Sequence, residues 1–173
     1  IVADYVIIMG YDEHFAGGEA GSVSSINYVK NGIAGMLENV PREKLIGGVP
    51  FYTRLWTEAG DGTITSKAMG IAEEKRWVDN NQVELTWQAD TAQYYGEVQT
   101  SDGAQFLWME EERSLKEKMN VIRQNDLAQE RFVPTLISNQ PGSTMGDAIR
   151  EELRESETFD ISVAFVSENA LKS

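Results

Sequence analysis

A short apolar run near the start of the chain places the strongest constraint on what it can fold into. Residues 6–8, Val-Ile-Ile, follow one another without polar alternation, which is typical of a strand covered on both faces, as in parallel sheets. We predict a strand over residues 3–9. Gly10, Tyr11 and Asp12 come directly after it, at the carboxyl end where such folds carry their chemistry. A glycine there lets a ligand approach the backbone, so Tyr11 and Asp12 are the first candidate site residues.

The next elements extend this strand into a parallel arrangement. Ser24 or Ser25 is placed to cap a helix, and Pro41 follows it. The apolar residues of this helix recur at helical spacing: Ile26, Val29, Ile33, Met36, Leu37 and Val40. A second apolar strand is predicted over residues 45–51. Strand, helix and strand form a βαβ unit, which is right-handed in parallel sheets.

Later residues favour shorter, antiparallel elements and then a tail. We predict a helix over 66–77, strands over 83–87, 92–98 and 104–109, a hairpin turn at 101–103, and a helix over 111–124. The acidic run at 110–112 is interpreted as the solvated start of that last helix. In the tail, residues 144–154 are predicted as a helix and 159–166 as a strand.

Two short motifs follow the two predicted parallel strands. Residues 9–12 read Met-Gly-Tyr-Asp, and residues 50–54 read Pro-Phe-Tyr-Thr-Arg. They resemble the motifs on the sixth and seventh barrel strands of family 18 glycoside hydrolases, the chitinase-like enzymes. The sequence of residues 13–18 is similar to the corresponding segment in the branch of that family that acts on bacterial spore cortex peptidoglycan. The segment 106–115 is similar to the one that leads into the helix after the seventh strand.

The resemblance covers residues 1–128 and implies an α/β fold that is part of a (β/α)8 barrel. The last strands of the barrel would be present, with a small α+β insertion at 57–110, and a short α/β tail would follow over 129–173. A complete barrel takes roughly 250 residues, whereas this chain has 173. Strands one to five should therefore lie upstream of Ile1. Open sheet edges invite pairing with another chain, so we expect self-association.

The resemblance also implies roles for four polar residues. Family members use substrate-assisted retention, in which the 2-acetamido group of the sugar attacks the anomeric carbon. Tyr11 would orient that acetamido group, and Asp12 would hydrogen-bond the sugar before the cleaved bond. Tyr52 and Arg54 would contact sugar at or beside that subsite. Taken alone, a Tyr-Asp pair after a strand is more often a turn and a cap, and Arg54 is more often a surface ion-pair partner.

Three further residues complete the candidate substrate contacts. Met9 belongs to the first motif, and Trp56 and Trp108 are candidate stacking platforms for a sugar face. Both tryptophans fit core packing equally well.

The catalytic acid of the family is missing from this chain. It lies in an Asp-x-x-Asp-x-Asp-x-Glu motif on the fourth strand, and no Asp-x-Glu tripeptide occurs here. We place it upstream of Ile1 and expect the chain as given to lack activity. Glu13 stands on the wrong strand to replace it, and His14 is not expected to act as a base or metal ligand. Residues 125–131 also lack the Trp that the eighth strand supplies in that family.

The tail after residue 131 resembles a different protein family. Residues 132–142, 149–153 and 159–167 are similar to the opening of the phospholipase D-like domain found at the start of certain bacterial helicases. Only the opening is present, because the catalytic His-x-Lys motif of that domain comes later and the sole histidine is His14. A chimera of two truncated genes and a natural fusion both remain open.

Composition limits the partners. A net charge of −13 opposes attraction to nucleic acid and to anionic membranes. The absence of cysteine excludes disulfides and thiolate metal sites, and we expect neither a cofactor nor a metal. The expected partner is a polysaccharide that contains N-acetylglucosamine. The location of this chain stays undetermined, although the parent family is bacterial and extracellular, or bound to the cell wall or spore.

The sequence therefore predicts the carboxyl-terminal part of a family 18 glycoside hydrolase that cleaves β-1,4 linkages in peptidoglycan or chitin. One alternative is a non-catalytic carbohydrate-binding or structural module built from the same half-barrel. Another is a nucleic-acid-processing protein defined by its tail.

Overall fold

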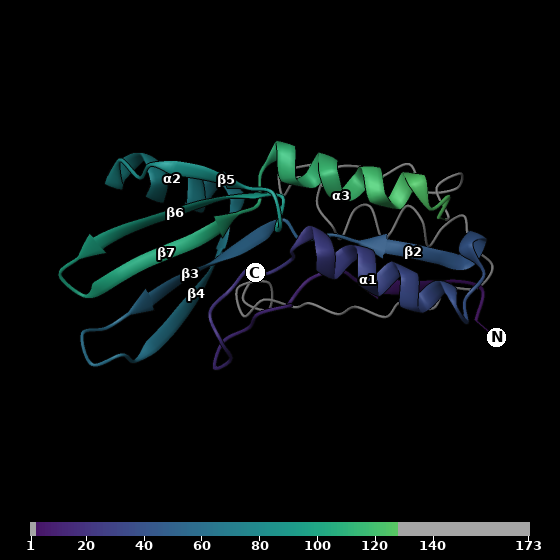
Figure 1. Ribbon diagram of the computed structural model, residues 1–173, viewed down its shortest axis with the longest axis horizontal. Helices are drawn as coiled ribbons and strands as arrows, with labels where there is room; N and C mark the ends of the chain where they lie inside the picture. Colours follow the sequence, from purple (N-terminus) through teal and green to yellow (C-terminus); the bar gives the residue numbers. More distant parts are fainter. Residues whose placement is uncertain (1–2, 128–173) are drawn as a thin grey trace, which may run out of the picture. The chain divides into compact units, whose positions relative to one another are not determined.

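The computed structural model describes residues 3–127, which form two sheets and three α-helices (Figure 1). In chain order the elements are β1 (Val6–Met9), α1 (Ile26–Leu37), a 3-10 helix (Arg42–Lys44), β2 (Leu45–Gly48), β3 (Tyr52–Glu58), β4 (Ile64–Gly70), α2 (Ile71–Asn81), β5 (Leu85–Gln88), β6 (Gln93–Thr100), β7 (Gly103–Met109) and α3 (Glu112–Gln124). The predicted tail elements at 144–154 and 159–166 lie outside the described residues. No helix within 3–127 is long and apolar enough to cross a bilayer.

The predicted βαβ unit is confirmed. β1 and β2 pair in parallel, from Val6 opposite Leu45 to Met9 opposite Gly48, and α1 lies between them in the chain. Ser25 caps α1, because its hydroxyl accepts a hydrogen bond from the backbone N–H of Tyr28 at 3.1 Å. Buried residues of α1, α3 and β2, together with three loop residues, form one core: Ile26, Val29, Ile33, Val40, Leu45, Ala92, Val121, Ile122 and Leu127.

The prediction that the first strand is covered on both faces is wrong. Val6 and Ile8 pack against the core of α1 and α3, while Ile7 and Met9 are 59% and 51% exposed. Exposure alternates along β1 because α1 and α3 cover only one face of the strand pair and no other described element covers the opposite face (Figure 1). Within residues 3–127 the two parallel strands do not close into a barrel.

The second sheet has five antiparallel strands in the order β4-β3-β7-β6-β5. The strands predicted at 83–87, 92–98 and 104–109 are confirmed as β5, β6 and β7, and the hairpin turn joins the last two. Gly103 takes a φ of +127° at that turn, and a Cβ there would lie 2.1 Å from the carbonyl oxygen of Glu58. Only glycine fits both demands.

In this region one prediction is wrong and one strand was missed. The helix predicted at 66–77 begins only at Ile71, and residues 64–70 form β4. The strand β3 was not predicted, yet it pairs with β4 over seven residues and with β7 on its other side. Hairpin pairing with β3, the preceding strand in the chain, therefore overrides the helical preference of residues 66–70.

The two faces of this sheet differ. One face carries a small core of Leu55, Met69, Leu107 and Met109, against which Trp77 and Val78 of α2 pack. Paired residues of antiparallel strands share a face, so Trp56, Phe106, Trp108 and Tyr95 stand on the other one. Tyr52 and Arg54 join them, because alternate residues of β3 point the same way.

Candidate functional site

The loop after β1 begins with a fixed peptide. The backbone N–H of Gly10 donates to the carbonyl oxygen of Gly48 at 3.0 Å, and a Cβ at residue 10 would lie 2.6 Å from that same oxygen. That Gly10 also makes room for a ligand stays a prediction. The glycine is needed because the neighbouring strand comes close.

Asp12 has a strained backbone. Its φ is +60°, a region that non-glycine residues rarely adopt and that costs of order 1–3 kcal/mol. Such a conformation persists when the residues around it are held, and both sides of Asp12 are. Gly10 is bonded to β2, and the backbone N–H of Glu13 donates to the carbonyl oxygen of Val23 at 2.9 Å.

Glu13 and His14 have structural partners. The two carboxylate oxygens of Glu13 accept from the backbone N–H of Ser25 at 2.7 Å and from its hydroxyl at 3.0 Å. This places a negative charge at the N-terminus of α1, where the helix dipole favours it. Nδ1 of His14 lies 2.8 Å from the carbonyl oxygen of Ser22. Neither residue is placed as a free acid or base.

Two strand ends meet at Asp12. The hydroxyl of Tyr52 donates to Oδ1 of Asp12, and the rings of Tyr11 and Tyr52 stand edge to face with centroids 6.4 Å apart. Burial, followed by the hydrogen bond to Asp12, raises the pKa of Tyr52. The phenol therefore stays protonated and remains a donor to the carboxylate. The structure thus joins the two sequence motifs through a side-chain contact.

Arg54 adds a cation to this cluster. Its Nη1 donates to the hydroxyl of Ser66 at 3.0 Å, and its Nε is buried without a hydrogen-bond partner among residues 3–127. Arg54 also acts electrostatically on Tyr52, two residues earlier on the same face of β3. An orphaned buried donor of this kind is suited to an acceptor oxygen of a ligand.

The three remaining candidates are placed differently. Met9 is 51% exposed at the end of β1. Trp56 is 1% exposed, and its indole N–H donates to the carbonyl oxygen of Gly21 at 2.9 Å. The prediction that Trp56 offers a stacking face is wrong, because the loop before α1 covers it.

Trp108 is half-buried and belongs to an aromatic cluster that sequence reasoning missed. Its ring centroid lies 5.1 Å from that of Tyr95 and 6.0 Å from that of Phe106. Its indole N–H donates to Oε1 of Gln88 at 2.7 Å. The alternation of aromatic residues along β6 and β7 was the signal for this cluster.

Of the candidate site residues, only Met9 lines the hollow beside β1. A hollow of about 300 Å³ lies between β1 and α1 and includes Met9, Gly10 and Glu13 in its lining, but not Tyr11, Asp12, Tyr52 or Arg54. Among the described residues, no group of three or more His, Cys, Asp or Glu side chains is placed to hold a metal ion.

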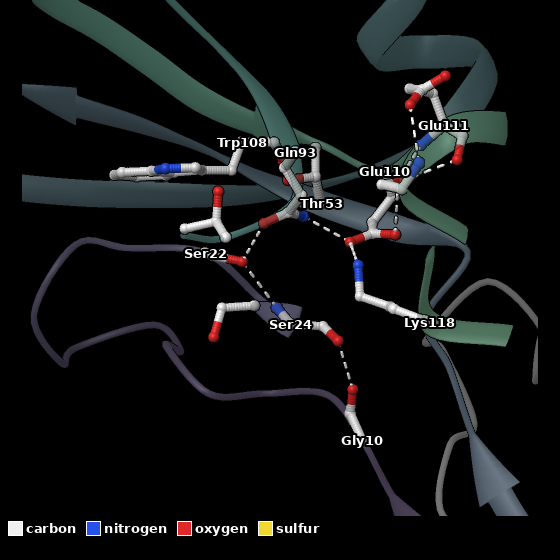
Figure 2. Close-up of polar contacts among 12 residues, drawn as sticks. Gly10, Ser22, Ser24, Thr53, Gln93, Trp108, Glu110, Glu111 and Lys118 are labelled. Atoms are coloured by element: carbon white, nitrogen blue, oxygen red, sulfur yellow. Dashed lines mark hydrogen bonds and ion pairs between the residues drawn. The ribbon is translucent and has the colours of Figure 1, made fainter. Parts of the chain in front are cut away.

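Sequence reasoning also missed a buried polar cluster. Gln93, Glu110 and Lys118 are each fully buried, and Lys118 lies 2.6 Å from Glu110 (Figure 2). Burial raises the pKa of Glu110, and the Lys118 ammonium offsets part of the rise. The interpretation of 110–112 as a solvated acidic run is thus wrong at Glu110. Glu111 instead closes a capping box with Ser114 at the start of α3.

Comparison with known proteins places the chain in a family. The uncharacterized glycosylase YvbX of Bacillus subtilis is 28% identical over 127 residues, covering 73% of this chain and 36% of YvbX. The cortical fragment-lytic enzyme of the same organism is 25% identical over 128 residues, covering 73% of this chain and 30% of that enzyme. The solved structure of YdhD, also from Bacillus subtilis, has a TM-score of 0.67 at 28% identity, covering 73% of this chain and 43% of that one.

The chain spans about a third of the length of these curated relatives. Residues 1–128 match the family described as glycosyl hydrolases family 18. Because that match covers well over half of the 173 residues, the chain belongs to glycosyl hydrolase family 18.

Proposed function

We propose that residues 3–127 form the part of a family 18 barrel that holds an N-acetylated sugar beside the cleaved bond, with β1 and β2 as late barrel strands. The contact between Tyr52 and Asp12 carries this proposal. It brings together a carboxylate and two phenols from neighbouring strand ends, and Arg54 stands two residues further along β3.

The chemistry of these groups suits an acetamido sugar. In substrate-assisted retention, positive charge develops on a cyclic intermediate made by the acetamido oxygen. A hydroxyl such as that of Tyr11 can orient this group, and the carboxylate of Asp12 can stabilise the developing charge. Because Asp12 is already held by Tyr52, little reorganisation is needed when the charge appears, which is the main electrostatic lever of enzymes.

The relatives support one substrate class. A relative whose name is cortical fragment-lytic enzyme covers the same stretch as this site, which supports peptidoglycan. Chitin shares the β-1,4-linked N-acetylglucosamine unit, so the proposal is a polymer that contains this sugar. The acid that protonates the leaving oxygen is not supplied by an Asp-x-Glu segment of this chain.

This absence favours a second candidate function, carbohydrate binding without catalysis. Both candidates require the same sugar site, and hydrolysis separates them. A chain that binds the oligomer without cleaving it supports the second candidate for the 173 residues as they stand.

A titration of N-acetylglucosamine oligomers followed by NMR tests the site. We expect shifts around residues 10–12 and 52–54, with a dissociation constant of about 1 mM, roughly 4 kcal/mol. Asp12→Asn should abolish binding, because it keeps a residue that tolerates positive φ and removes only the charge. Asp4→Asn, at an exposed position before β1, is the matched control. Unchanged binding by Asp12→Asn would refute the site.

A further inference from the structure

Five buried polar residues link the insertion to the loop that carries Tyr11 and Asp12. We call Ser22, Ser24, Gln93, Glu110 and Lys118 the Gln93 network. Figure 2 shows Gln93 of β6 between Ser22 and Glu110, with Lys118 beyond Glu110 and Ser24 leading to Gly10. All five side chains are at most 4% exposed.

The direction of each hydrogen bond is determined by the one before it. The Lys118 ammonium can only donate, and it donates to Oε1 of Glu110, the same oxygen that accepts the amide N–H of Gln93. The carbonyl oxygen of Gln93 then faces Ser22, whose hydroxyl must donate to it. The oxygen of Ser22 is left to accept the backbone N–H of Ser24 at 3.0 Å.

The network ends on the peptide next to the site. The hydroxyl of Ser24 donates to the carbonyl oxygen of Gly10 at 2.6 Å, while the N–H of Gly10 bonds to β2 at 3.0 Å. Gly10 is therefore held through both its N–H and its carbonyl. The next two residues are Tyr11 and Asp12, and the strained φ of Asp12 requires such support.

A buried ion pair is a weak source of stability. Taking Glu110 and Lys118 out of water costs several kcal/mol per ion, and apolar residues of similar size often stabilise a fold as well or better. A satisfied polar network does specify one arrangement, because every partner has a single orientation. The Gln93 network is thus better suited to positioning than to stability.

We propose that Gln93 is a positioning residue for the sugar site: through Ser22 and Ser24 it sets the Gly10 peptide and so the placement of Tyr11 and Asp12. The insertion would then determine the geometry of the site as well as forming its own sheet. The expected effect on sugar binding rests on the proposed function. The expected effect on the Gly10 peptide can be measured without any sugar.

The test compares Gln93→Leu and Ser24→Ala with wild type in the full 173-residue chain. Gln99→Leu is the matched control, because Gln99 is an exposed residue of the same strand. Amide hydrogen exchange is measured at Gly10 and Glu13, whose N–H groups flank the site, and at Val29 in α1 as an internal reference. Binding of a tri-N-acetylglucosamine oligomer is measured by NMR on the same samples.

We expect exchange at Gly10 and Glu13 to speed up by about threefold to tenfold in both variants, as for the loss of one buried hydrogen bond. Exchange at Val29 should not change, the oligomer should bind about threefold or more weakly, and Gln99→Leu should behave as wild type. Ser24→Ala removes a single oxygen and keeps the test decisive if Gln93→Leu does not fold.

The outcomes separate the two proposals. If exchange at Gly10 and Glu13 is unchanged in a folded Gln93→Leu or in Ser24→Ala, or rises equally at Val29, positioning is refuted. If the wild type binds no oligomer while exchange responds as expected, the proposed function fails and the positioning role stands. If the oligomer binds at Tyr11 and Asp12 with unchanged affinity in both variants, the sugar site stands and positioning is refuted.

Discussion

A buried carboxyl in α2 should make the stability of this chain depend on pH. Glu74 is fully buried, one of its oxygens accepts from the backbone N–H of Glu110 at 3.3 Å, and the other has no hydrogen-bond partner among the described residues. Burial raises the pKa of Glu74 from 4.5 to about 8. The folded protein therefore keeps this proton at pH values where the unfolded chain has released it.

The difference in the pKa of Glu74 between the folded and unfolded states sets the direction and the largest possible size of the change in the free energy of unfolding with pH. Below pH 4.5 the carboxyl of Glu74 is protonated in both the folded and the unfolded chain. The contribution of this group to the free energy of unfolding is therefore fully present there. Between pH 4.5 and about 8 only the folded state keeps this proton, so the free energy of unfolding falls as the pH rises. Each pKa unit corresponds to about 1.4 kcal/mol, which sets a ceiling of about 5 kcal/mol, a large part of the 5–15 kcal/mol typical of domains.

Urea unfolding at pH 5, 6, 7 and 8 measures this effect. Glu74→Gln keeps an acceptor oxygen for the N–H of Glu110 and cannot ionise, so its free energy of unfolding should fall less steeply with pH than that of wild type. Glu117→Gln, at an exposed position of α3, is the control and should keep the wild-type slope. An unchanged slope in Glu74→Gln would refute the reasoning.

Three other outcomes can be checked directly. The 173-residue chain should leave a chromogenic β-N-acetylglucosaminide uncut, since general acid catalysis supplies roughly 10²–10⁴-fold; turnover like that of an intact family member would contradict this and would first be traced with Glu13→Gln. Lys118→Met should lower the free energy of unfolding by about 3–5 kcal/mol, whereas adding Glu110→Leu should restore most of it; equal losses in urea unfolding would count against the ion pair. Sedimentation velocity should show self-association that rises with concentration, because Ile7 and Met9 are exposed on a face of β1 that no other described element covers; a monomer at every concentration would disprove it.

Local signals were sufficient for much of the fold. The helical spacing of apolar residues and the cap at Ser25 predicted α1, and the short apolar strands around it predicted a parallel pair. The hairpin at Gly103 was readable because a tight turn needs residues that accept its backbone angles. Each of these features depends on neighbours within a few positions in the chain.

The candidate site was only partly readable. The two motifs named Tyr11, Asp12, Tyr52 and Arg54, but 40 residues separate the partners of the hydrogen bond between Tyr52 and Asp12. Whether a tryptophan offers its ring or fills a core depends on what covers it, and Trp56 is covered by a loop that starts far earlier in the chain.

The remaining features were decided by tertiary structure alone. Ile7 is exposed because the described helices cover only the other face of β1. Gln93 and Ser22 meet across 71 residues of sequence. Burial and hydrogen-bond direction depend on which distant groups come together, and no local pattern of residue types specifies that.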